Sequence, residues 1–228
     1  MEAEFWHERW RNNQIGFHQD YINPWLEKYW NSLNLEKGAH VFVPLCGKTR
    51  DMLWLMEQGY RVTGIEISEI AVETFFRESD LIPAIEETLD LKRWRYENLS
   101  IFSGDIFALR AADIGAVRGI YDRAALIAFP PEMRHRYAAH VSGLLSPGAR
   151  GLLVSLEYPA GEMEGPPFAV FETEVCELFS QGWKIDVIES SDCLEENTKF
   201  RERGLSELRE VVYRLGFSGT RTRDATDR

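Results

Sequence analysis

Residues Ala39–Ser68 read AHVFVPLCGKTRDMLWLMEQGYRVTGIEIS, and this stretch decides the fold. An apolar run over 41–45 predicts a buried strand, and a tight turn at 46–48 leads into a helical pattern that starts at Asp51. Gly59 is placed to end that helix as its C′ residue. A second strand over 61–67 carries Glu66 at its carboxyl end. The stretch therefore predicts a complete β-α-β unit.

Glu66 follows the turn by about twenty residues, where an acidic side chain can hydrogen-bond the two hydroxyls of a ribose. The turn itself has only Gly47, whereas a dinucleotide site needs a glycine-rich turn that lets backbone amides approach a pyrophosphate. It also lacks the earlier glycine of a Walker loop. A cofactor with a ribose and no phosphate removes both demands. S-adenosylmethionine is such a cofactor.

Helices and strands are expected to alternate along the remaining chain. A helix over 69–79 is expected to turn Ile70, Phe75 and Phe76 inward, and residues 80–97 show no clean period. Two more helices are expected near 131–145 and 171–180. The further expected strands are 99–103, 117–121, 149–156, 183–190 and 208–216, with 205–212 alternatively helical in part. This alternation predicts an α/β fold with a mostly parallel, doubly wound sheet.

The domain organisation is expected to be simple. Residues 1–217 are predicted to form one domain. Within it, the aromatic-rich segment 1–37, with short helices near 3–12 and 23–34, is expected to cap the cofactor site. Residues 218–228 lack apolar side chains and are predicted to be a disordered tail.

Several polar features follow predicted strands directly. They are Leu45-Cys46-Gly47, Glu66, Asp105 and Asp122-Arg123. Because ligands of parallel sheets bind at the carboxyl ends of the strands, we expect these residues to meet at one edge. The ribose would then lie on Glu66, the adenine near Asp105 and Ile106, and the methionine end near Leu45.

Composition excludes several classes of protein. The formal net charge of −11 disfavours binding to nucleic acid, which usually requires a basic face. No apolar run approaches the length of a membrane span, and the N-terminus does not resemble a signal peptide. Three widely spaced cysteines favour reduced thiols in a cytoplasm. We expect a cytoplasmic, monomeric protein that binds neither membranes nor nucleic acid.

Each candidate site residue also has an ordinary structural explanation. Arg123 could simply pair with Asp122 or Asp105, while Trp10 and Phe17 could be packing residues in an aromatic-rich segment. Cys46 has no histidine near it in sequence to activate it as a nucleophile. His135 and His140 lack the spacing of a metal site. The aromatics Phe168 and Phe171, beside Gly165-Pro166-Pro167, fit loop packing or a substrate lid equally well.

Specific motifs in this chain resemble the thiopurine S-methyltransferase family, in particular its bacterial branch. They are FWHERWRNNQIGFH (5–18), VPLCGKTRDM (43–52), GIEIS (64–68), GDIF (104–107), YDRAALIA (121–128) and GPPF (165–168). The resemblance covers about residues 4–217. It implies a class I methyltransferase fold with a seven-stranded sheet, a final antiparallel strand and an N-terminal helical lid. It also implies S-adenosylmethionine as methyl donor and aromatic or heterocyclic thiols, such as 6-mercaptopurine, as acceptors.

The resemblance assigns site residues by matching motifs. The cofactor residues it implies are Trp10, Leu45, Glu66, Asp105, Ile106 and Arg123. Phe17 matches a position that contacts the acceptor, and the family also offers the substrate a basic residue from its C-terminal segment. Lys199, Arg201 and Arg203 compete for that role, and Lys199 is our choice. No metal is expected.

The chemistry can be argued from the residues themselves. Methyl transfer from a sulfonium requires alignment of the sulfur, methyl and acceptor atoms, which fixed geometry provides. A thiol reacts as its thiolate, so a positive group near the acceptor sulfur is needed. Arg123 stays charged and could act there as the catalytic residue, and soft selenium or tellurium compounds would exploit the same pocket. The rival hypotheses are a nicotinamide or nucleotide-sugar enzyme, and a non-catalytic module that senses S-adenosylmethionine.

Overall fold

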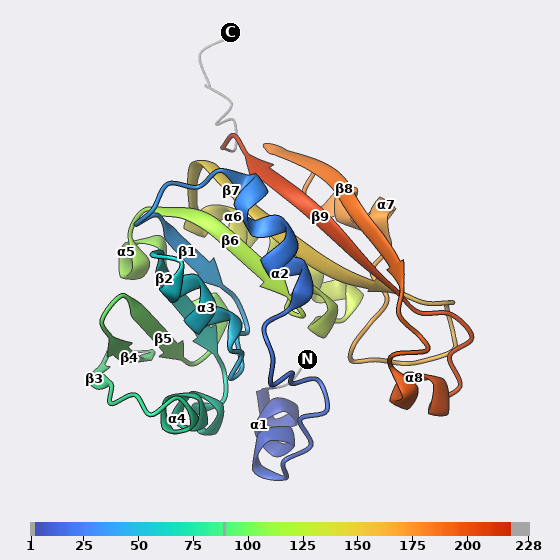
Figure 1. Ribbon diagram of the computed structural model, residues 1–228, viewed down its shortest axis with the longest axis horizontal. Coiled ribbons are helices and arrows are strands. Elements are labelled where there is room, and N and C mark those ends of the chain that lie inside the picture. The colour runs from blue at the N-terminus through green and yellow to red at the C-terminus, as the bar shows by residue number, and fades with distance from the viewer. Residues whose placement is uncertain (1–2, 89, 220–228) are drawn as a thin grey trace, which may run out of the picture.

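A single mixed β-sheet organises the protein. The computed structural model describes residues 3–88 and 90–219 (Figure 1). The sheet has nine strands in the order β3-β4-β5-β2-β1-β6-β7-β9-β8. Neighbours from β5 to β7 are parallel, whereas the pairs β3–β4, β4–β5, β7–β9 and β8–β9 are antiparallel. The strands are β1 (His40–Val43), β2 (Arg61–Glu66), β3 (Ala84–Glu87), β4 (Lys92–Tyr96), β5 (Leu99–Ser103), β6 (Val117–Arg123), β7 (Leu145–Glu157), β8 (Trp183–Asp192) and β9 (Arg209–Phe217).

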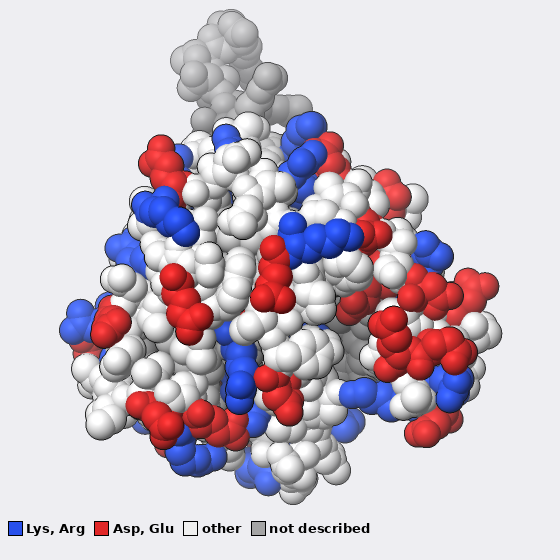
Figure 2. All heavy atoms as spheres, viewed as in Figure 1, with Lys and Arg blue, Asp and Glu red and all other residues white. Residues whose placement is uncertain are grey.

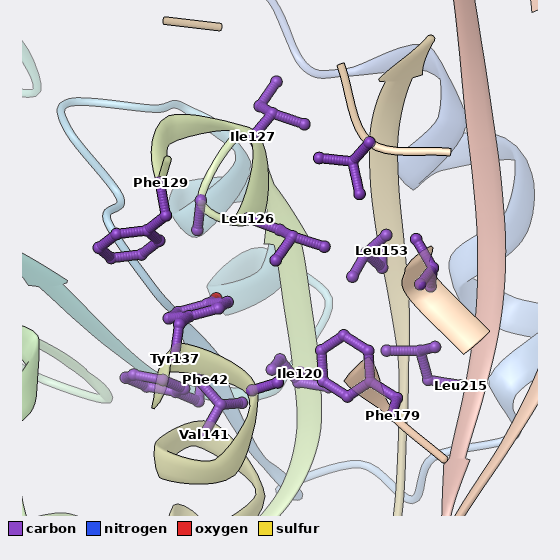
Figure 3. Close-up of a cluster of buried hydrophobic side chains, with 14 of the residues drawn as sticks. Phe42, Ile120, Leu126, Ile127, Phe129, Tyr137, Val141, Leu153, Phe179 and Leu215 are labelled. Carbon is purple, nitrogen blue, oxygen red and sulfur yellow. The ribbon is translucent and has the colours of Figure 1, made fainter. Parts of the chain in front are cut away.

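Successive residues of the parallel strands point to opposite faces of the sheet, and each face is buried by its own helices. On one face, Phe42 and Ile120 pack beneath Tyr137 and Val141 of α6 (Figure 3). The elements of this face are η2 (Ile106–Ala108), α5 (Ala111–Ile114), η3 (Leu126–Ala128), α6 (Pro131–Leu144) and α7 (Glu172–Leu178).

The opposite face is covered by the elements that precede and follow β1 and β2. Val41, Val43 and Tyr121 point to this face and pack with the buried Trp30 and Met52. The covering elements are α2 (Pro24–Tyr29), η1 (Trp30–Leu33), α3 (Asp51–Glu57) and α4 (Glu69–Glu78). The predicted doubly wound α/β fold, with helices on both faces of the sheet, is therefore confirmed.

Two elements lie outside this sandwich. Helix α1 (Ala3–Arg11) contacts α4 and lies beyond the carboxyl ends of the parallel strands (Figure 1). Helix α8 (Thr198–Glu202) lies in the connection between β8 and β9. The predicted tail over 218–228 falls almost entirely outside the described residues.

The sheet differs from the expected one at one edge. Residues 80–97, which show no clean period, contain the hairpin β3–β4, so the sheet has nine strands where seven were expected. The other seven have the expected antiparallel strand, β9, inserted between β7 and β8. The alternative of a helix over 205–212 was wrong, because β9 begins at Arg209. Ile70 is 41% exposed and does not face the core, unlike Phe75 and Phe76.

Charged side chains of both signs are interspersed over the face in Figure 2, and acidic ones gather toward α8. The described residues of this face form no continuous basic surface. Within 3–88 and 90–219, no helix combines the length and the apolar character that a bilayer span requires.

Gly64 of β2 allows the turn after β1, residues 46–48, to pack closely against the sheet. A Cβ at this position would lie 2.7 Å from Cys46 Sγ and 2.8 Å from Met52 Sδ. We expect Gly64→Ala to lower the free energy of unfolding by about 1–3 kcal/mol, measured in urea. Gly143→Ala is the matched control, because a Cβ there meets nothing within 4 Å and Gly143 lies in α6. That variant should gain about 0.5–1 kcal/mol. Equal stability of the two variants would contradict this packing argument.

Candidate active site

The carboxyl ends of β1, β2, β5 and β6 meet at one edge, as predicted. The register places Glu66 beside Ser103 at the ends of β2 and β5, and the Cys46 amide donates to the Ile65 carbonyl at 2.9 Å. The turn after β1 is thereby held against β2. The edge thus brings together Leu45, Glu66, Asp105 and Arg123 from four separate loops or strand ends.

Glu66 is a buried carboxylate held by two backbone amides. Gly47 N donates to Oε2 at 2.9 Å, and Ser68 N donates to Oε1 at 2.9 Å. Burial raises the pKa of Glu66 to about 7, although these amides act in the opposite direction. Each carboxylate oxygen can accept two hydrogen bonds and here accepts one from an amide. One further position on each oxygen therefore remains for a hydroxyl donor. This arrangement suits the two hydroxyls of a ribose.

The turn that carries Gly47 has an unusual backbone. Leu45 has φ of +46° and Gly47 has φ of +51°, and a non-glycine residue in this left-handed region is uncommon and often marks a functional site. The ring of Trp10 lies directly over Gly47, since a Cβ there would come within 3.3 Å of it. Helix α1 therefore covers the turn through a buried tryptophan.

Asp105 and Ile106 lie at the end of β5, where the adenine was expected. Asp105 is exposed and caps η2, with its Oδ1 accepting from Phe107 N at 3.0 Å. Ile106 is buried. This pair offers an apolar surface next to a solvent-facing carboxylate, which fits an adenine ring with its exocyclic amine.

Arg123 and Asp122 are neighbours that point to opposite faces of the sheet. Asp122 is buried and accepts hydrogen bonds from Ala125 N, Leu126 N and the Tyr137 hydroxyl, the last at 2.6 Å. Burial raises the pKa of Asp122 to about 6. Arg123 is half-buried and forms no ion pair or hydrogen bond with the described residues. It pairs with neither Asp122 nor Asp105, so its guanidinium remains available for a ligand.

Phe17 and Lys199 meet at the lid. The ring of Phe17 is 39% exposed and packs edge-on against Trp10 and Trp6, with ring centroids 5.7 and 5.5 Å apart. Lys199 Nζ donates to the carbonyl of Gly16, next to Phe17. Helix α8 is thereby attached to the lid loop.

The other two basic candidates, Arg201 in α8 and Arg203 directly after it, have different contacts. Arg201 forms an ion pair with Glu195 at 2.8 Å, and the Arg203 guanidinium lies over the ring of Phe200 at 6.0 Å. Lys199 is thus the candidate whose contact reaches the lid loop itself.

Two clefts flank the site. One, of about 470 Å³, lies between the lid loop, the start of α3 and the end of α4, with His18, Lys48 and Glu78 on its walls. The other, of about 390 Å³, lies between α1 and the residues that adjoin Glu66 and Asp105, among them Ser68 and Gly104. Their described lining residues do not include Trp10, Leu45 or Arg123.

The alternative chemistries lose support. Burial raises the pKa of the Cys46 thiol well above its usual value, so it is a poor nucleophile. Among residues 3–88 and 90–219, no three His, Cys, Asp or Glu side chains are grouped as metal ligands. Phe168 N donates to Ile127 O at 2.8 Å and its ring lies under the Arg134 guanidinium, so this residue packs the loop.

Asp51 is a polar site residue that the sequence analysis did not select. Only 1% of it is exposed, and its Oδ1 accepts from Asn23 N at 2.8 Å. An aspartate in the first turn of a helix is common because it favours the helix dipole, so its position alone did not distinguish it. What could have drawn attention to Asp51 in the sequence is its position four residues after Gly47, close to the predicted turn.

The raised pKa of Glu66 has a consequence for stability. The folded protein holds a proton on Glu66 up to about pH 7, whereas the unfolded chain releases it near the usual 4.5. Stability should therefore fall as pH rises from 4.5 to about 7, by about 3 kcal/mol at most.

The variant Glu66→Gln should remove this fall, as measured by urea unfolding of the ligand-free protein across that range. Asp122 contributes a fall of its own between pH 3.8 and about 6 in both proteins, so the difference between the two curves isolates Glu66. Parallel curves would show that Glu66 ionises normally.

Comparisons with known proteins show the family to which this chain belongs. The family model described as thiopurine S-methyltransferase matches residues 1–217. A thiopurine S-methyltransferase of Pseudomonas paraeruginosa is 51% identical over 215 residues, which cover 94% of this chain and 99% of that protein. One of Azotobacter vinelandii is 50% identical with the same coverage.

A solved structure confirms the fold. The N1-methyltransferase for 1,6-didemethyltoxoflavin from Burkholderia thailandensis, with bound S-adenosylhomocysteine, matches with a TM-score of 0.62 and 16% identity. The match covers 95% of this chain and 87% of that one. The family match over residues 1–217 and the relatives at about half identity show it: this chain belongs to the thiopurine S-methyltransferase family, whose methyl donor is S-adenosylmethionine.

Proposed function

We propose that this protein transfers the methyl group of S-adenosylmethionine to the sulfur of flat aromatic or heterocyclic thiols, thiopurines such as 6-mercaptopurine among them. One observation carries the proposal: Glu66, held by two backbone amides, and an unpaired Arg123 lie at the same edge of the sheet, where Trp10 of the aromatic lid covers the turn after β1. The curated relatives are named for the same reaction.

Each residue has a role in this proposal. Glu66 holds the ribose, Asp105 and Ile106 hold the adenine, and Leu45 and Trp10 enclose the methionine end. When bound, the cofactor supplies an electrophilic methyl group on a sulfonium. The acceptor loses its proton to solvent and attacks as a thiolate. The thiolate would take up this methyl group and become a thioether, and the cofactor would leave with a neutral sulfur.

Arg123 is the proposed catalytic residue. Its guanidinium is permanently charged and has no partner in the described part of the chain, so it can hold the thiolate without first breaking an ion pair. Phe17 and Trp10 provide flat apolar walls for an aromatic acceptor. Lys199 places the lid loop beside that acceptor through Gly16.

An assay with labelled S-adenosylmethionine and 6-mercaptopurine tests the proposal, and a methyl thioether is the expected product. Arg123→Ala should lower kcat by about 100-fold, because it removes the charge that stabilises the thiolate. Arg123→Lys should recover part of the loss. Calorimetry should find cofactor affinity changed by no more than about threefold.

The absence of product across a panel of thiols and a selenol would refute the proposed reaction and return the sensing module to consideration. A larger loss in cofactor affinity than in turnover would instead assign Arg123 a purely binding role. The selenol arm also tests whether softer acceptors enter the pocket.

Lys199→Ala should raise the KM for the thiol by roughly fivefold, since one hydrogen bond from a charged donor contributes about 1 kcal/mol. Arg201→Ala is the matched control, because Arg201 lies on the same short helix and pairs with Glu195 away from the lid loop. It should leave the KM unchanged. If both variants behave alike, the contact between Lys199 and Gly16 does not serve the acceptor.

We also propose that the protein acts in the cytoplasm as a monomer. The three cysteines, Cys46, Cys176 and Cys193, are unpaired, which suits a reducing compartment.

A further inference from the structure

Asp51 is a buried carboxylate at the centre of the polar residues behind the cofactor turn. It begins α3 directly after the turn that contains Gly47, and only 1% of it is exposed. Asn23 N donates to its Oδ1 at 2.8 Å, and Asn23 is itself buried as the cap of α2. The Asp51 carboxylate is therefore held by the backbone of Asn23, where the N-terminal segment leads into α2.

Asp51 lies on the same face of the sheet as Arg123. Tyr121 and Arg123 are two residues apart on β6, so their side chains point to one face, and Tyr121 packs in the cluster beneath α3. The charge of Arg123 acts on Asp51, and both charges act on Tyr121. The Tyr121 hydroxyl is fully buried and faces Asp51, and a hydrogen bond to it favours the charged form of that carboxylate.

Two other charged side chains near this point have partners of their own. Lys48 is bound by both carboxylate oxygens of Glu78, at 2.9 and 2.8 Å. Asp122 points to the opposite face and is held by Tyr137. Arg123 has no ion pair within the described ranges. Asp51 is thus a buried carboxylate on this face that interacts with Arg123: burial raises the pKa of Asp51, and the charge of Arg123 acts in the opposite direction.

We infer that Asp51 is a positioning residue that supplies the negative charge of the reacting centre. It balances Arg123 and, on the proposed function, the sulfonium of the methyl donor. The consequence is a preference in binding. S-adenosylmethionine is cationic at the reacting sulfur and S-adenosylhomocysteine is neutral there, while the two molecules are otherwise identical apart from the methyl group. Asp51 therefore favours binding of the donor over retention of the product.

The test compares both molecules in binding, without turnover. Calorimetry would measure the dissociation constants of S-adenosylmethionine and S-adenosylhomocysteine for the unmodified protein and for Asp51→Asn. The asparagine keeps an oxygen to accept from Asn23 N but has no charge. We expect it to weaken donor binding by about tenfold relative to product binding, because a unit charge at short range in a partly buried site has this effect.

Asp122→Asn is the matched control, since it removes a buried carboxylate from the neighbouring strand end on the opposite face. It should keep the ratio of the two constants within about twofold. Circular dichroism would verify folding, and Asp51→Ser, which also retains an uncharged acceptor, replaces Asp51→Asn if that variant does not fold.

The outcomes separate the two proposals. If Asp51→Asn weakens both ligands equally, Asp51 has only a structural role and the inference is wrong. If Asp122→Asn changes the ratio as much as Asp51→Asn, the effect is not specific to this face and the inference also fails. If the unmodified protein binds neither ligand, it is the proposed function that fails.

Discussion

The rest of the site depends on the two hydrogen bonds that the Glu66 carboxylate accepts. This carboxylate connects the turn after β1 to the first residue before α4, through the amides of Gly47 and Ser68. These amides would otherwise be unpaired donors at the edge of a buried sheet, which is costly. The bond donated by Gly47 N holds this residue where Trp10 can cover it. Removing the carboxylate would therefore affect the cofactor turn, the helix start and the lid together.

Asp122 and Arg123 point to opposite faces of the sheet, and the two side chains differ in how many partners they have. Asp122 and Arg123 are adjacent, yet one is saturated by Tyr137 and two amides while the other has no partner among the described residues. The alternation of a β-strand produces this difference without any loop rearrangement. An arginine without a partner and a saturated aspartate can therefore occupy consecutive positions because their surroundings differ completely.

Much of this arrangement could be predicted from local sequence, because periodicity and turn residues determine the core β-α-β unit. Gly59 ends α3 as expected, and α2 begins close to the expected start of the second short helix. The β3–β4 hairpin was missed because its strands carry charged residues with a single buried apolar position, Trp94, and so lack a clear alternation. Asp51 was missed because its partner Asn23 is distant in sequence, and only the folded chain brings the two together.

The position of β9 between β7 and β8 has a consequence for the order in which the protein can be built. During synthesis β7 emerges first, and its thirteen residues have no partner on that edge until the last strand of the sheet is made. Strand β8 must wait as well, because it pairs with β9 and not with β7. A long unpaired edge is prone to associate with other chains. The nascent chain thus carries its greatest risk of aggregation until translation is almost complete.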